Sequence, residues 1–163
     1  MRIIESTELR QLCLDTAAKH GARGMDAALF IGDYDYVLPT EDSVRAFGKR
    51  FMDFLFSSNL NKYAEERNDC DDYAQHAASF AKIDHARHFL GEQALAFGVA
   101  WIATDTLLHA VNIAVHAGED GKPYLRLCEP QVTWNDRNTI GQPYMSLREF
   151  DISSVRLWQL VCF

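Results

Sequence analysis

The segment 95–101 alternates large and small side chains, and no other segment constrains the fold as strongly. Its large residues are Leu95, Phe97, Val99 and Trp101, and its small ones are Ala96, Gly98 and Ala100. Because successive side chains of a strand point to opposite faces, this pattern predicts a strand with one bulky and one small face. A helix predicted to begin near residue 68 has a stripe of mostly small residues at helical spacing: Cys70, Tyr73, Ala74, Ala77 and Ala81. We expect this stripe to pack on the small face of the strand.

Two further helices are predicted before this one. The first begins at Ser6 or Thr7, which can cap it, and ends near residues 19–21. The second begins at residues 39–42, and its apolar positions recur at helical spacing from Val44 to Leu55. Residues 21–38 between them are expected to form a long loop.

The second half of the chain is predicted to be mainly strands. Residues 109–117 and 124–129 flank a turn-rich segment and indicate a hairpin. A loop over residues 130–143 and a buried strand over residues 155–163 complete the chain. Helices followed by antiparallel strands predict an α+β fold, with the N-terminal helices packed on an antiparallel sheet in a single domain, 1–163.

Composition excludes several classes of partner. The 163 residues include 16 Lys+Arg against 23 Asp+Glu, a net charge of -7, and the chain has no basic run. We therefore expect no binding to nucleic acid, which requires clustered cations. No apolar stretch resembles a membrane span or a signal-peptide core, so a cytoplasmic location without membrane attachment is expected. Four cysteines without a Cys-x-x-Cys pair favour reduced thiols, and the composition leaves the oligomeric state open.

Cys70 is the first candidate for chemistry. It lies at the start of a predicted helix, where the helix dipole and free backbone N–H groups stabilise a thiolate or an oxyanion. The alternative is that it is a small buried hydrophobe on an alanine-rich face. The neighbouring aspartates oppose thiolate formation unless they cap the helix, face away or are neutralised by a cation.

His109 and Glu129 are the candidates for activating that thiol. An imidazole can take the thiol proton, and a carboxylate can hold the imidazole in the required tautomer. If the hairpin pairs Val111 with Glu129, then Glu129 lies diagonally across from His109 on the same face. A slip of one residue would instead present Asn112 and bring Gln131 nearer to His109, so these two are the alternative orienting residues.

Three short motifs carry a resemblance to a known family. They are Asp69-Cys70-Asp71-Asp72-Tyr73-Ala74, His109-Ala110-Val111-Asn112 and Glu129-Pro130-Gln131. Their order resembles papain-like and transglutaminase-like cysteine peptidases, and most closely the fungal agglutinin C-terminal cysteine-protease domain with its bacterial and phage relatives. The sequence departs from these patterns at Leu108, where relatives commonly have glycine, and at Ala64, where papain has its oxyanion glutamine.

The resemblance implies a papain-like fold in which Cys70 is the nucleophile, His109 the base and Glu129 the orienting carboxylate. It also implies that Asp69, Asp71 and Asp72 are candidates to hold Ca²⁺, since the fungal enzyme depends on calcium. The expected function is that of a cysteine peptidase, an amide hydrolase acting on a peptide or protein substrate. The alternative is a catalytically inactive papain-like protein that binds or inhibits a partner, as a phage-encoded inhibitor would. In a third interpretation, the three residues only satisfy a core.

Overall fold

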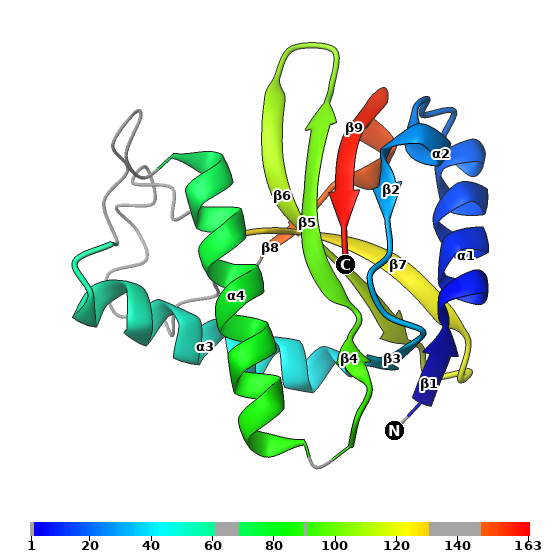
Figure 1. Cartoon of the computed structure of the whole chain (residues 1–163). Coiled ribbons are helices and arrows are strands. Elements are labelled where there is room, and N and C mark those ends of the chain that lie inside the picture. Colours follow the sequence, from blue (N-terminus) through cyan, green and yellow to red (C-terminus); the bar gives the residue numbers. More distant parts are fainter. Residues whose placement is uncertain (1, 61–68, 90, 131–147) are drawn as a thin grey trace.

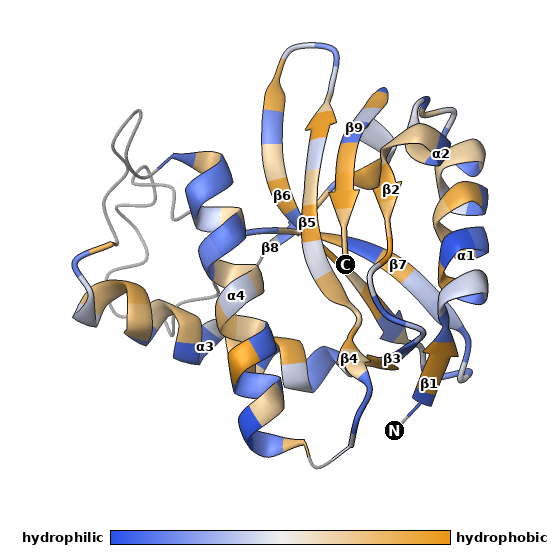
Figure 2. Cartoon of the chain, in the orientation of Figure 1, coloured by the Kyte–Doolittle hydropathy of each residue, from blue (hydrophilic) through white to orange (hydrophobic). Residues whose placement is uncertain are grey.

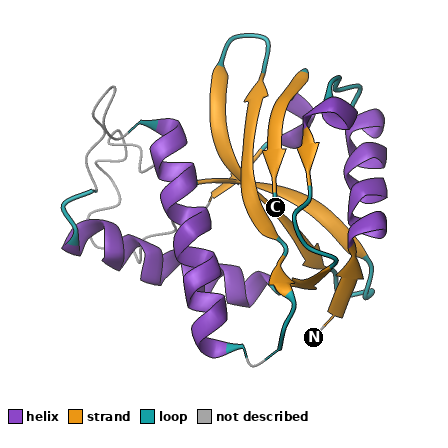
Figure 3. Ribbon diagram, in the orientation of Figure 1, coloured by secondary structure: helices purple, strands orange, loops and turns teal. Residues whose placement is uncertain are grey.

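The chain folds as an α+β protein in which a six-stranded sheet lies between two groups of helices (Figures 1 and 3). The structure is a computed structural model that describes residues 2–60, 69–89, 91–130 and 148–163. The strands of the sheet follow the order β2 (Leu29–Phe30), β9 (Leu157–Cys162), β5 (Phe97–Ala103), β6 (Leu108–Ala117), β7 (Pro123–Glu129) and β8 (Arg148–Phe150). β2 runs parallel to β9 and the other neighbours are antiparallel, so the sheet is mixed and not purely antiparallel as expected.

The expectation of a loop over residues 21–38 was wrong. This segment contains α2 (Met25–Ala28), β2 and β3 (Asp35–Leu38). β3 lies between β1 (Arg2–Glu5) and β4 (Ala94–Leu95) in a second, three-stranded sheet. These elements are short, and β2 and β3 are completed by strands from distant parts of the chain, so local sequence carries little signal for them.

The three long helices begin close to the predicted positions. They are α1 (Ser6–Lys19), α3 (Glu41–Ser57) and α4 (Cys70–His88). α1 follows Glu5 without a side-chain cap, whereas the Thr40 hydroxyl accepts a hydrogen bond from the Ser43 N–H at 3.2 Å. At α4, Asp69 and Asp72 form a capping box that satisfies two backbone donors. The candidate nucleophile Cys70 is therefore the first residue of a well-capped helix. No helix in the described ranges is both long and apolar enough to cross a membrane.

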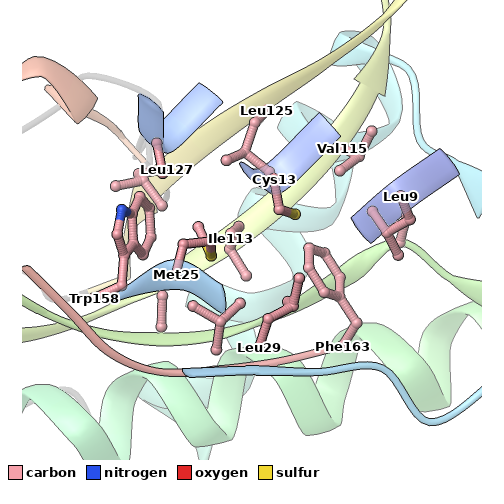
Figure 4. Packing of buried hydrophobic residues seen from close by; sticks show 14 of the residues in the cluster. Leu9, Cys13, Met25, Leu29, Ile113, Val115, Leu125, Leu127, Trp158 and Phe163 are labelled. Carbon is pink, nitrogen blue, oxygen red and sulfur yellow. The ribbon is translucent and has the colours of Figure 1, made fainter. Parts of the chain in front are cut away.

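Each face of the large sheet is covered by its own hydrophobic core. The helices that cover the sheet carry both hydrophobic and hydrophilic residues (Figure 2). On one face, residues of α1 and α2 pack against β6, β7 and β9 (Figure 4). The labelled members of this core are Leu9, Cys13, Met25, Leu29, Ile113, Val115, Leu125, Leu127, Trp158 and Phe163. On the other face, α3 and α4 pack against β5 and β6. Side chains on opposite faces of the sheet therefore lie in two different cores.

The alanine stripe of α4 packs on the bulky face of β5, which corrects the expectation that it would pack on the small face. Phe97 and Val99 share a core with Ala74 and Ala77, with Trp101 packed against it. Ala96 and Ala100 belong to the opposite core, among large side chains such as Tyr36 and Trp158. Close packing requires large groups to face small ones, so each small surface is filled by bulk from the opposing element.

His116 is a buried polar residue on β6 with no hydrogen-bond partner for either ring nitrogen among the described residues. Its ring stacks on Tyr124 with the centroids 5.3 Å apart. Burial and the nearby charge of Arg126 lower the pKa of His116 to about 4, while Glu41 acts in the opposite direction. Because a buried charge is costly, the ring is neutral at pH 7.

We expect this buried imidazole to make the fold sensitive to mild acid. In the unfolded chain a histidine titrates near its ordinary pKa of 6.5, above the folded value of about 4. The unfolded state therefore binds the proton first, and stability present above pH 6.5 is lost progressively towards pH 4, by up to about 3 kcal/mol. Urea unfolding of the wild type and of His116→Phe, which keeps the stacking but cannot titrate, should show a larger acid loss in the wild type. Parallel pH dependences of the two proteins would contradict this interpretation.

Candidate functional site

His109 and Glu129 form a hydrogen-bonded pair at one end of the sheet. Asn112 on β6 lies opposite Cys128 on β7, which places Val111 opposite Glu129, so of the two registers that the sequence left open the structure has the one that puts Glu129 on the face of His109. His109 Nε2 lies 2.5 Å from Glu129 Oε2, and the two side chains are only 9% and 16% exposed. The ring of Phe150 on β8 packs against the imidazole with the centroids 5.8 Å apart. Because a carboxylate only accepts, Nε2 is the donor, and in the neutral ring Nδ1 is left as the basic nitrogen.

Cys70 reaches the same end of β6 from α4. Its half-buried thiol lies against the backbone of Ala110, the residue after His109, which acts to lower the thiol pKa. Burial raises the pKa of the Cys70 thiol, and the carboxylates of Asp69 and Asp71 raise it further. The thiol is therefore protonated at neutral pH in this conformation. Within the described part of the chain, its hydrogen bonds are with backbone groups and not with the His109 ring.

Strand alternation explains why the thiol and the imidazole are separate. His109 pairs with Ile102, whose side chain lies in the core under α1, whereas Ala110 lies in the core under α4. His109 and Glu129 thus share one sheet face, and α4 with Cys70 covers the other. The imidazole therefore points away from the face that α4 covers.

The three aspartates of the predicted calcium cluster make two kinds of contact, a helix cap and a contact between two carboxyl groups. Asp72 Oδ2 accepts the Asp69 backbone N–H at 3.3 Å and so belongs to the helix cap. The carboxyls of Asp69 and Asp71 are hydrogen-bonded to each other, which raises the pKa of Asp71. One ligand atom from each of Asp69, Cys70 and Asp71 lies within 4.8 Å of the others. Ca²⁺ takes about six to eight oxygen ligands, so these described residues alone do not fit it, and calcium binding stays a prediction.

Asn112 does not orient His109. Its side-chain amide is fully buried and donates to the carbonyl oxygens of Ala74 at 2.9 Å and of Gly98 at 3.0 Å. The residue is therefore a tie between α4, β5 and β6, which corrects its assignment as an alternative orienting residue. The other alternative, Gln131, lies outside the described residues, as does most of the predicted loop over residues 130–143.

Phe150 is the contact residue of the site that the sequence did not reveal. It lies 41 residues beyond His109 and reaches the imidazole only because β8 pairs with β7. A single phenylalanine in a three-residue strand has no local pattern that would have identified it.

The comparisons with known proteins identify likenesses of fold. No known family matches the sequence, and no curated protein does either. Two solved structures match 99% of this chain. "PSL1a-E64 complex" is 17% identical with a TM-score of 0.67, and the Polyporus squamosus lectin bound to Neu5Aca2-6Galb1-4GlcNAc is 16% identical with a TM-score of 0.68. The chain spans about half the length of each, 50% and 49%.

These matches correct the family assignment made from the three motifs. The matching structures are those of a lectin and not of a papain-like cysteine peptidase, and a papain-like fold is not confirmed. The functions expected from that family are therefore wrong as well. They are the cysteine peptidase, its inactive papain-like alternative and the peptide or protein substrate. The α+β class stands, because it rests on the observed helices and mixed sheets.

We expect truncation of Asn112 to destabilise the protein without a specific effect on His109. Asn112→Ala removes two buried hydrogen bonds and leaves a cavity between α4 and the sheet, which should lower the free energy of unfolding by about 2–4 kcal/mol. Leu108→Ala on the same strand is the control, since Leu108 is 68% exposed and should change stability by less than about 0.5 kcal/mol. Equal stabilities of the two variants in urea unfolding would contradict the role assigned to Asn112.

Proposed function

We propose that Cys70, His109 and Glu129 form a thiol reaction site, with Cys70 as nucleophile, His109 as base and Glu129 as the orienting carboxylate. One observation carries this proposal: the sheltered His109–Glu129 bond is one residue from the Ala110 backbone that contacts the thiol. Cleavage of peptides is no part of it, because the matching structures are those of a lectin.

The chemistry of each residue supports its role. Glu129 accepts from Nε2–H, which fixes the tautomer in which Nδ1 is basic and favours the ring when it becomes protonated. The raised pKa of Cys70 keeps the thiol uncharged until its proton can be transferred to His109. Cys70 is also the first residue of α4, where the positive end of the helix dipole stabilises negative charge on the sulfur.

The reaction that these groups support is addition of the thiol to an electrophilic carbon of a small molecule. The sulfur forms a bond to the carbon, and its proton moves to His109 Nδ1 once the side chains have rotated into contact. The bond from that carbon to its leaving oxygen breaks, and the oxygen receives the proton from His109. With an epoxide, the products are a thioether and a hydroxyl on the same adduct, so no further reactant is needed.

Alkylation by a small epoxide tests this site, with each cysteine followed by peptide mass spectrometry. We expect His109→Ala to slow modification of Cys70 at pH 7 by about a hundredfold, a typical general-base contribution, and Glu129→Gln to slow it less. The half-buried Cys162 is the internal control and should react equally in all variants. Cys13 and Cys128 should stay unmodified in the folded protein, because burial raises the pKa of each to about 12.

One result would contradict the role proposed for His109. If Cys70 reacts at the same rate in the wild type and in His109→Ala, and follows pH as Cys162 does, then His109 is not its base. Circular dichroism of His109→Ala keeps this result interpretable, because an unfolded variant would expose Cys13 and Cys128 to the reagent as well.

A second candidate function is binding of a glycan. The observation that favours it is the fold match to a lectin whose structure was determined with a sialylated trisaccharide. That glycan is bound by that protein, and the present chain spans about half of its length.

Binding to immobilised oligosaccharides tests the second candidate. The probes are the sialylated trisaccharide named above and its neutral part, Galβ1-4GlcNAc. We expect saturable binding that free oligosaccharide displaces, and we expect Cys70→Ser to bind as the wild type does, since the thiol belongs to the first candidate. The heat-unfolded chain is the negative control. Absence of displaceable binding to both probes would reject glycan binding for these sugars.

A further inference from the structure

A cavity of about 580 Å³ lies between α3, α4, β3 and β4, apart from the thiol site. The apolar part of its lining that is partly exposed consists of Leu95 and Phe89, whereas Phe47 and Phe97 behind them are only 6% and 1% exposed. Its polar rim comes from both helices and consists of Thr40, Ser43, Arg50, Asp84, His85 and His88. The volume lies within the range of about 300–1,000 Å³ that is usual for small-molecule sites. Such sites usually combine an apolar lining with a few polar groups, as this cavity does.

The charged groups of the rim neutralise each other. Arg50 Nε and Nη2 donate to the two carboxylate oxygens of Asp84 at 3.1 and 2.6 Å. This bidentate pair uses two of the five guanidinium N–H groups, which leaves donors of Arg50 for a ligand. The rim therefore offers hydrogen bonds without a net charge to attract an ion.

The two imidazoles of the rim offer lone pairs. His85 Nε2 lies 3.2 Å from the carbonyl oxygen of Gln93, and His88 Nδ1 lies 2.8 Å from that of Asp84. Because a carbonyl oxygen only accepts, each of these nitrogens must carry the proton. In the neutral rings, His85 Nδ1 and His88 Nε2 are then acceptors for a ligand hydroxyl, and both would repel an anion.

The hydroxyl groups of the rim complete a mixed set of donors and acceptors. The Thr40 hydroxyl oxygen accepts from the Ser43 N–H, which leaves its O–H to donate. The Ser43 hydroxyl donates to the Thr40 carbonyl oxygen at 2.7 Å, which leaves its oxygen to accept. A ligand that fits this set must both donate and accept, as the hydroxyl groups of a sugar do.

We propose that this cavity binds a neutral saccharide, with an apolar face of a sugar ring against Leu95 and Phe89 and its hydroxyl groups on the rim. The assignment rests on glycan binding, the second candidate function, and names its site and its charge preference. A sialic acid carboxylate fits less well, since it would meet the Asp84 carboxylate and two imidazole lone pairs. The site is independent of Cys70, because 14 residues of α4 separate Cys70 from Asp84, about 21 Å along the helix.

Titration of the folded chain with Galβ1-4GlcNAc, followed by ¹H–¹⁵N NMR, tests the assignment. We expect shifts of the backbone amides of Leu95 and Ala81, which line the cavity, and none at Cys70. Ser43→Trp places a bulky ring at the exposed rim and should weaken binding about tenfold or more. His88→Ala removes one acceptor and should weaken it about threefold to tenfold. Arg87→Ala, an exposed α4 neighbour outside the cavity lining, is the matched control and should match the wild type.

The outcomes separate the site from the function it rests on. If the wild type binds neither Galβ1-4GlcNAc nor the sialylated trisaccharide, glycan binding fails and the site assignment fails with it. If the wild type binds but Ser43→Trp and His88→Ala bind equally well, only the site assignment is overturned. Tighter binding of the sialylated trisaccharide than of the neutral disaccharide would overturn the preference for a neutral ligand. The spectra of Ser43→Trp and His88→Ala also show whether each variant is folded.

Discussion

The buried amide of Asn112 sets the geometry on which the rest of the structure depends. A polar group in an apolar core must find partners, and this side chain finds the carbonyls of Ala74 on α4 and Gly98 on β5. Cys70 precedes Ala74 by about one helical turn, and His109 precedes Asn112 by three residues on β6. The same tie therefore fixes how the backbone segments that carry Cys70 and His109 lie relative to each other.

α4 organises two chemically different regions at its two ends. At its N-terminus, burial and two aspartates raise the pKa of Cys70, so the thiol is uncharged and its reactivity depends on a base. Towards its C-terminus, Asp84 pairs directly with Arg50 of α3 and lines a cavity together with His85 and His88. The alanine stripe between these ends lets the helix lie close to the bulky side of β5. One tightly packed helix thereby holds both regions in fixed positions.

The three motifs identified real contacts but the wrong family. Residue types and strand spacing predicted the hairpin and named His109 and Glu129 as partners in one of two registers, and the structure has that register and that bond. A cysteine, a histidine and a carboxylate in this order do not by themselves specify a family or a function, since function depends on the complete site. The lectin matches are likewise matches of fold at 16–17% identity, so the thiol and glycan proposals rest on the geometry of particular residues.

The sequence by itself determined the long helices, the hairpin and the α+β class, because each depends on periodicity or on residues adjacent in the chain. The tertiary structure alone decided which face of β5 receives α4, how β2 and β3 are completed, and where Phe150 lies. It also decided that Asn112 faces α4 while His109 faces the other core. These outcomes depend on partners distant in sequence, and packing selects among arrangements that local patterns leave equally favourable.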